Sequence, residues 1–191
     1  MKQERKWQAD PWLDEQETLE PDDYKSAHES LKVDRGHQAP LASFKGTDDW
    51  QETNYLSNIT PQKSELNQCP WEQLESKVRN LAKANVVYVM TCPLYERNMS
   101  SLSNADEPHK IPSGYWQIIL VQTSKSVNSI KSASFIFEQN TPKTDKVIEH
   151  LSTINEIERR SKLDFLWELP DNIEEQIESD KFQEWAEQKF E

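Results

Sequence analysis

The densest group of chemically useful side chains in this chain is the tetrapeptide Asp34-Arg35-Gly36-His37. It places a carboxylate, a guanidinium and an imidazole within four positions, and Gly36 is one of only 3 glycines in 191 residues. A glycine allows a positive φ or the close approach of a ligand, so the chain can turn here and present His37. An imidazole titrates near neutral pH, as a general base requires. On its own the tetrapeptide is weak evidence, since a histidine after a turn is more often a solvated loop residue.

A second group of polar residues lies in residues 64–84, a segment with the spacing of a helix. Proline is tolerated only in the first turn of a helix, so Pro70 predicts that the regular helix begins near residues 67–69. Steps of four place a ladder of residues along this helix: Asn67, Trp71, Glu75 and Arg79. The polar members of the ladder also have ordinary structural interpretations. Asparagine is a common N-cap, and Glu75 with Arg79 forms an i,i+4 ion pair.

Together these residues fall into three blocks that stand in order along the chain. The blocks are residues 34–40, residues 54–62 and residues 66–68, the last followed by Trp71, Leu74 and Glu75. In these blocks the chain resembles the Serratia-type DNA/RNA non-specific endonucleases, and the similarity runs over residues 5–170. The resemblance implies an α+β fold, namely a ββα-metal nuclease core with a central antiparallel sheet flanked by helices.

The resemblance also implies chemical roles. His37 is the general base that activates water, and Asn67 is the metal ligand through its amide oxygen. The implied ion is Mg²⁺, with Mn²⁺ as an alternative; Mg²⁺ prefers oxygen ligands and keeps most of its waters, so one protein ligand is enough. Glu75 accepts a hydrogen bond from water on the ion and fixes the orientation of that water.

Three arginines are implied as clamps for phosphate oxygens, for which the guanidinium fork is suited: Arg5, Arg35 and Arg79. Asp34 and Asn58 are implied as supporting hydrogen-bond residues. Two alternatives stay open at this point. An arginine near a terminus, such as Arg5, is usually a solvated charge, and Arg35 can instead be tied to a structural carboxylate.

Hydrophobic periodicity predicts the elements that must position these residues. A strand over residues 31–37 delivers His37 at its end, and its partner strand is expected over residues 54–60. Further strands are predicted over residues 85–91, 115–122 and 133–138, with long loops over residues 39–51 and 93–112. Helices are predicted over residues 22–31, over residues 153–162 behind a capping box, and over residues 171–190.

Length and composition predict one domain, residues 1–191, with 35% hydrophobic residues and a mean hydropathy of −0.92. Cys69 and Cys92 indicate no disulfide framework, and no apolar run is long enough to span a membrane. No signal peptide is visible, so a cytoplasmic location is expected, or secretion if the chain is a piece of a longer precursor. Family members carry N-terminal strands before the position of Arg5, and this chain is expected to lack them.

The net charge of −12 argues against a general affinity for a polyanion, although lysines outnumber acids over residues 109–146. The expected function is a Mg²⁺-dependent, sugar-non-specific endonuclease that cleaves DNA and RNA to 5′-phosphate products. The alternative is a catalytically silent module of the same fold that binds nucleic acid or a partner. An inhibitor protein and a homodimer through the C-terminal helix are further expected partners, although a helix docked on its own domain explains the same amphipathic pattern.

Overall fold

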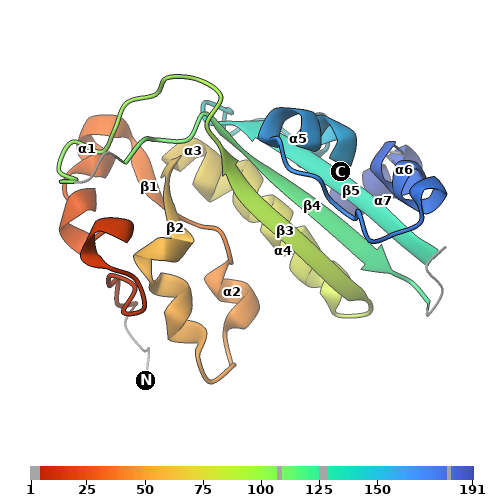
Figure 1. Ribbon diagram of the computed structural model, residues 1–191, viewed down its shortest axis with the longest axis horizontal. Coiled ribbons are helices and arrows are strands. Elements are labelled where there is room, and N and C mark those ends of the chain that lie inside the picture. Colours follow the sequence, from red (N-terminus) through yellow and green to blue (C-terminus); the bar gives the residue numbers. More distant parts are fainter. Residues whose placement is uncertain (1–4, 107–108, 125–128, 180–181) are drawn as a thin grey trace.

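The computed structural model describes residues 5–106, 109–124, 129–179 and 182–191 and confirms the predicted α+β class. Its strands form a two-stranded sheet of order β1-β2 and a four-stranded sheet of order β3-β4-β5-β6, and the pairing is antiparallel throughout. Figure 1 shows the small sheet and a group of short helices on one side of the molecule and the large sheet on the other.

The small sheet carries the Asp-Arg-Gly-His motif. Strand β1 (Val33–His37) pairs with β2 (Ile59–Lys63), and His37 lies opposite Ile59 at the end of the ladder. Gly36 has no positive φ, so the predicted turn is wrong. The glycine is instead required by close packing, because a Cβ atom there would lie 2.6 Å from Oε1 and 2.7 Å from Cβ of Gln62.

The predicted helix over residues 64–84 is present but is not uniform. It begins as α3 (Ser64–Leu66), passes through the π-helical turn η5 (Asn67–Trp71) and continues as α4 (Glu72–Ala82). Pro70 lies inside η5, a wider turn in which a missing N–H is more easily accommodated. Asn67 has helical dihedrals (φ −59°, ψ −43°), so its ordinary interpretation as an N-cap is wrong.

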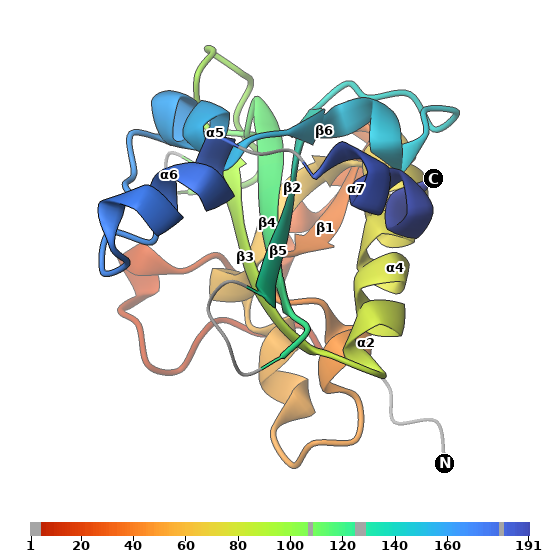
Figure 2. The same cartoon turned by 90° about the vertical axis from the view of Figure 1, so that its right-hand side faces the viewer.

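The large sheet is covered by helices on both faces (Figures 1 and 2). Its strands are β3 (Val86–Leu94), β4 (Gly114–Gln122), β5 (Ile130–Glu138) and the short β6 (Leu151–Ser152). Side chains of β4 alternate between two cores, as period-2 geometry requires. Ile119 and its face neighbours pack with α4 and with α7 (Gln183–Phe190), whereas Ile118 and its face neighbours pack with α5 (Ile154–Ser161) and α6 (Asp171–Ser179).

The C-terminal segment forms two helices, so the single predicted helix over residues 171–190 is wrong. Helix α6 ends at Ser179 and helix α7 begins at Gln183, and Phe182 directly before α7 has a φ of 44°. The apolar positions Ile177, Ala186 and Phe190 are buried against the domain itself. Docking within the chain therefore accounts for the amphipathic pattern. At α5, Thr153 accepts the predicted capping hydrogen bond from the Glu156 N–H at 3.2 Å.

Short helices replace several expected segments in the first sixty residues. They are η1 (Glu15–Glu17), η2 (Pro21–Tyr24), α1 (Ala27–Leu31), α2 (Leu41–Phe44), η3 (Trp50–Asn54) and η4 (Leu56–Asn58), with η7 (Val147–His150) later in the chain. The helix predicted over residues 22–31 is thus two pieces, and the loop predicted over residues 39–51 contains α2. The strand predicted over residues 54–60 is wrong in position, because β2 begins only at Ile59.

Cys69 and Cys92 are free thiols. Among the described residues, none of the helices combines the length and apolar character needed to cross a bilayer.

Candidate active site

Four of the predicted site residues line one pocket of about 370 Å³: Arg5, His37, Asn67 and Glu75. They come from the N-terminal arm (residues 5–14, before η1), the end of β1, the η5 turn and α4. Residues separated by seventy positions in sequence therefore share one surface depression. A second depression of about 380 Å³ adjoins the first, since Arg5 and Asn67 line both, and it contains Asp34 and Arg35.

His37 is held by a residue to which the sequence analysis assigned no role. Its Nε2 lies 3.3 Å from Oδ1 of Asn54, an amide that is only 1% exposed. The Nδ2 of Asn54 donates to the carbonyl of Gln51 at 3.2 Å, which fixes the amide so that its oxygen faces the imidazole. We therefore assign the hydrogen to Nε2, which leaves the Nδ1 lone pair free to accept a proton.

The environment of His37 keeps the ring neutral. Burial lowers the pKa of His37 to about 4, and the positive charge of Arg5 acts in the same direction, while the hydrogen bond to Asn54 opposes them. A neutral imidazole is the form that can accept a proton from water. Asn54 is the first residue of the second block, residues 54–62. Its place in that block is the one sequence feature that could have pointed to a role at the site.

Asp34 organises the metal-ligand candidate. Its carboxylate accepts hydrogen bonds from four side chains, which are His28 at 2.9 Å, Ser64 at 2.8 Å, Gln68 at 2.7 Å and Asn67 at 3.3 Å. Burial raises the pKa of Asp34, but these hydrogen bonds outweigh it and the net pKa is lowered. Because Nδ2 of Asn67 donates to Asp34, its Oδ1 is the amide atom left for a cation.

Glu75 and Arg79 form the predicted ion pair on α4, with 3.6 Å between Oε2 and Nη1. The Glu75 side chain is only 14% exposed. Burial raises its pKa to about 7, and the guanidinium of Arg79 opposes that effect only in part. A carboxylate that is this poorly neutralised by its neighbours gains from a further positive charge nearby.

Arg35 has no ion-pair partner within the described residues, so its alternative interpretation as the partner of a structural carboxylate is wrong. Its Nη2 donates to the carbonyl of Pro21 at 2.9 Å. Its guanidinium lies over two aromatic rings, at 4.9 Å from the centroid of Tyr24 and 5.4 Å from that of Trp7. Arg5 lies over the Trp7 ring as well, at 5.6 Å.

The side chain of Asn58 hydrogen-bonds to backbone groups on two segments near His37. Its Oδ1 accepts from the N–H of Ala39 at 2.9 Å, and its Nδ2 donates to the carbonyls of Ala39 at 3.0 Å and Thr53 at 2.9 Å. The side chain thereby ties the segment that follows His37 to the turn that carries Asn54. Asn58 holds the backbone, and no catalytic role follows from this geometry.

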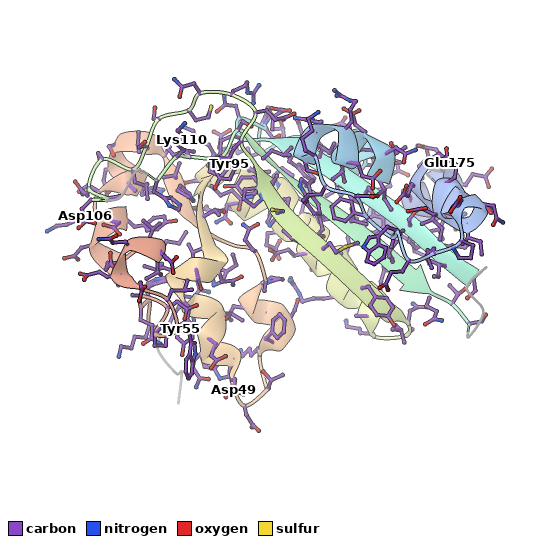
Figure 3. All side chains as sticks on the ribbon, viewed as in Figure 1. Asp49, Tyr55, Tyr95, Asp106, Lys110 and Glu175 are labelled. Carbon is purple, nitrogen blue, oxygen red and sulfur yellow. The ribbon has the colours of Figure 1, made fainter. Side chains whose placement is uncertain are left out.

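The donor set of the first pocket fits a hard divalent cation. The amide oxygen of Asn67 and the buried carboxylate of Glu75 line the same depression, and Mg²⁺ favours such oxygen donors. A separate acidic group, Glu20 with Asp23 and Asp106, brings three carboxylates within 4.8 Å of one another in the described chain. Glu20 and Asp23 already cap η2, and Figure 3 shows Asp106 at the end of the molecule that carries α1. None of the three lines the His37 pocket.

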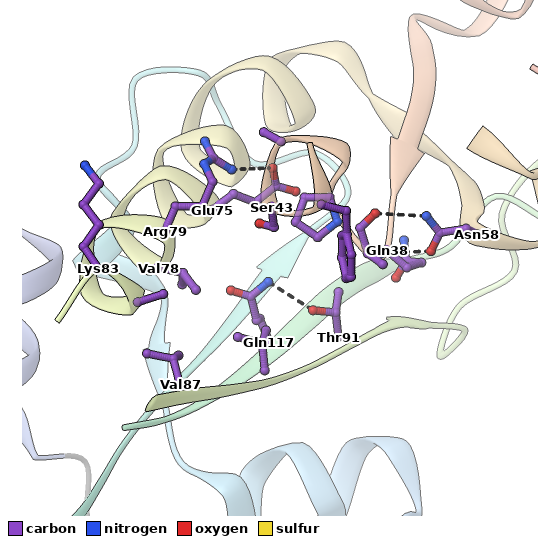
Figure 4. A pocket seen from close by; sticks show the side chains of 16 residues that line it. Gln38, Ser43, Asn58, Glu75, Val78, Arg79, Lys83, Val87, Thr91 and Gln117 are labelled. Atoms are coloured by element: carbon purple, nitrogen blue, oxygen red, sulfur yellow. Dashed lines mark hydrogen bonds and ion pairs between the residues drawn. The ribbon is translucent and has the colours of Figure 1, made fainter. Parts of the chain in front are cut away.

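A larger depression of about 750 Å³ extends the first pocket along α4, and the two share Pro40, Ala42 and Glu75. Figure 4 shows its walls, with Arg79 from α4 and Lys83 directly after that helix on one side, and Val87 and Thr91 from β3 on the other. The three depressions adjoin through shared residues. We call them together the site groove.

Comparisons with known proteins show the family of the chain. The family model for DNA/RNA non-specific endonucleases matches residues 1–172. The chain is 48% identical over 178 residues to the nuclease of Serratia marcescens, an alignment that covers 92% of this chain and 66% of that protein. It is 29% identical over 145 residues to mitochondrial endonuclease G of Bos taurus, covering 70% of this chain and 48% of that protein.

A solved structure supports the fold independently. The structure titled as the EndoG/EndoGI complex and the mechanism of EndoG inhibition superposes with a TM-score of 0.72 at 22% identity, over 86% of this chain and 70% of that one. The chain thus spans about two thirds of the Serratia nuclease and half of bovine endonuclease G. With a family model matched along most of its length and close to half of its residues shared with the Serratia enzyme, the chain belongs to the DNA/RNA non-specific endonuclease family.

Proposed function

We propose that this chain is a metal-dependent endonuclease that hydrolyses phosphodiester bonds of DNA and RNA and leaves 5′-phosphate products, with Mg²⁺ as its ion. The observation that carries the proposal is the convergence of His37, Asn67 and Glu75 on one pocket. That combination supplies a neutral base and two oxygen donors, which hydrolysis of a charged diester requires.

The proposed base is Nδ1 of His37. With Nε2 hydrogen-bonded to Asn54, the free lone pair takes a proton from the water that attacks phosphorus. The low pKa of His37 keeps this nitrogen unprotonated throughout the neutral range. Asn54 prevents the ring from rotating, and it stabilises the imidazolium that forms during the step.

Asn67 and Glu75 are the residues proposed to hold the ion. When bound, Mg²⁺ supplies Lewis-acid stabilisation of the phosphate and of the departing 3′-oxygen. Asn67 presents its Oδ1 because Asp34 and Gln68 lock the surrounding polar network. Glu75 contributes negative charge and orients water around the ion by accepting hydrogen bonds.

Binding of the polyanion is proposed to follow the site groove. Among the described residues, the groove is lined by four cationic side chains, Arg5, Arg35, Arg79 and Lys83, and by three carboxylates, Asp34, Glu72 and Glu75. The acidic helix α6 lies across the sheet from α4, as Figures 1 and 2 show, and Figure 3 marks Glu175 on it. The net charge of −12 is therefore unevenly distributed, and the local potential favours phosphate in the groove.

An inhibitor protein is a second proposed partner, because the structural neighbour was solved as a complex whose title names inhibition. A protein that places acidic side chains in the site groove would compete with nucleic acid for the same cations. The silent-module alternative receives no support from the site, because the base and both oxygen donors are present together.

The test is incubation of the purified chain with plasmid DNA and with RNA, in Mg²⁺ and in EDTA. Both polymers are expected to be cut only when the metal is present. His37→Ala is expected to lower the cleavage rate by a factor of about 10² to 10⁴. Asn67→Ala is expected to lower the affinity for Mg²⁺. Asn80→Ala, on the same helix, is the control, because its side chain is exposed and accepts a hydrogen bond from Lys83 away from the pocket. Binding without cleavage would establish the silent module, and cleavage in EDTA would overturn the metal assignment.

A further inference from the structure

Trp7 contacts three of the groups on which the proposed chemistry depends. Its ring centroid lies 5.3 Å from that of His37, at an interplanar angle of 39°. The guanidinium carbons of Arg35 and Arg5 lie 5.4 Å and 5.6 Å from the Trp7 ring centroid. One indole thus adjoins the proposed base and two of the proposed phosphate ligands. The indole itself offers no acid, base or metal ligand.

The position of Trp7 is fixed by its neighbours in the chain and by the core. The carbonyl of Gln8 accepts from the N–H of Leu56 at 2.9 Å, and Gln8 forms a bridge with Tyr55. Trp7 is partly buried against an apolar cluster that includes Tyr24, Val33 and Ile59. The arm therefore delivers the indole to β1 through backbone bonding and apolar packing together.

We propose that Trp7 is a positioning residue for the nuclease reaction: its indole holds the imidazole of His37 in place and gathers the guanidinium groups of Arg5 and Arg35 beside it. This inference deepens the proposed function and rests on it. Trp7 does not react with the substrate. It acts through the three residues that it contacts.

Two physical effects carry the proposal. A guanidinium is attracted to the electron-rich face of an indole, and the same ring can attract two cations that would otherwise repel each other. Within the part of the chain that the structure describes, the Trp7 ring is the contact that holds Arg5. The aromatic wall also excludes water from the imidazole, and the resulting burial keeps the pKa of His37 low.

The chain provides a matched control in the same arm. Trp12 has the same side chain five positions later, and it is 84% exposed. Its removal changes the aromatic content of the arm and leaves the site contacts intact. Trp12→Ala is therefore compared with three changes at Trp7: alanine removes the ring, leucine keeps apolar volume, and phenylalanine keeps an aromatic face.

The experiment measures two quantities in each full-length variant. The first is the pKa of His37, from an NMR titration of its imidazole. The second is the pair kcat and KM, on an oligonucleotide in Mg²⁺, over a range of pH. In Trp7→Ala and Trp7→Leu we expect the pKa of His37 to rise from about 4 toward 6.5, kcat to fall about tenfold or more, and KM to rise. Trp7→Phe should keep the pKa of His37, kcat and KM close to their wild-type values, and Trp12→Ala should match the wild type.

The outcomes separate this inference from the proposed function. Unchanged pKa and unchanged kcat in folded Trp7→Leu would overturn it, and so would an equal loss in Trp12→Ala. Recovery by leucine as complete as by phenylalanine would show that only volume matters, which also overturns it. If the wild type does not cleave, the proposed function fails, and the positioning of the imidazole is still decided by the titration. If Trp7→Ala does not fold, the leucine and phenylalanine variants decide.

Discussion

The large sheet and the site-bearing region are held together by different forces. The sheet buries large apolar side chains on both faces, with Phe135, Phe137, Ile118 and Ile119 all at 0% exposure. The region around His37 has short elements and is tied by side-chain hydrogen bonds from Asp34, Asn54 and Asn58. Apolar packing is non-directional and tolerates small errors, whereas a polar network fails when one partner is removed. We therefore expect the sheet to determine stability and the polar network to determine activity.

The largest expected effect on stability is in the sheet. Phe135 is fully buried and packs on Phe190 with ring centroids 4.9 Å apart. Phe135→Ala should lower the free energy of unfolding by about 3 to 5 kcal/mol. Urea denaturation measures the loss, and Val86→Ala, at a site 54% exposed on the same sheet, should cost less than about 0.5 kcal/mol. Equal losses in the two variants would contradict the division between the regions.

The next effect tests the polar network. Asn58→Ala leaves three backbone groups of Ala39 and Thr53 without their partner. Each lost bond to a partly buried group costs about 1 kcal/mol, so the total is expected at about 2 to 3 kcal/mol. The cleavage activity should fall by more than the smaller fraction of folded protein explains. The reason is that the turn that carries Asn54 moves, and Asn54 holds His37. Denaturation and cleavage assays on the same preparation measure both, and a stability loss with unchanged kcat would contradict the prediction.

The hydrogen bond between Asn54 and His37 tests the role of the polar network at a single contact. Asn54→Ala removes the acceptor at Nε2 of His37, so the ring can take either tautomer and can rotate. We expect kcat to fall roughly tenfold or more with a smaller change in stability. Nitrogen chemical shifts of the imidazole report the tautomer. A single Nε2–H tautomer retained in the variant would show that Asn54 is not the group that fixes it.

The pH dependence provides a fourth test, at Glu75. Burial raises the pKa of this carboxyl to about 7, so without metal it is protonated below that pH and ionised above it. A bound cation favours the ionised form, so the affinity for Mg²⁺ should rise as the pH increases toward 7, by up to about tenfold per unit. Calorimetry between pH 5.5 and 7.5 measures it. Glu75→Gln should abolish the dependence, whereas Glu65→Gln, on the exposed start of the same helix, should leave it intact.

The smallest effect is expected at the surface. Arg159 and Glu156 form an ion pair at 2.6 Å, but the two side chains are 68% and 38% exposed. Solvent screens such a pair, so Arg159→Ala should leave the free energy of unfolding unchanged within the error of the measurement. Activity should not change. A larger loss in urea denaturation would mean that α5 depends on this pair.

The same contrast explains what could be predicted from the sequence. The strands of the large sheet follow from runs of apolar and β-branched residues, because a strand that is buried on both faces is apolar at successive positions. Residues 54–60 have no such run. Their alternation predicts a strand, but side chains of Thr53, Asn54 and Asn58 bond to nearby carbonyls and favour short helical turns instead. Local bonding of this kind competes with a sheet ladder without leaving a periodic signal.

The site shows a similar limit. The resemblance supplies Arg5, His37, Asn67 and Glu75, and the structure brings all four to one pocket. The sequence analysis assigned no role to Asn54 or Trp7, because their contacts with His37 join segments that are 17 and 30 positions apart along the chain. Such contacts depend on how β1 is placed against the arm and the turns. Sequence spacing alone contains no measure of that placement.

The wide turn η5 has a consequence for the angular register of the helix. Asn67 and Glu75 are eight residues apart, which in a regular α-helix is about 2.2 turns, so their side chains would diverge around the axis. A π-helical turn takes up additional residues without adding rotation, and it brings the two side chains back toward one line facing the pocket. A regular α-helix through the same residues would place the amide of Asn67 about a fifth of a turn away from the carboxylate of Glu75, and only one of the two side chains would then face the pocket.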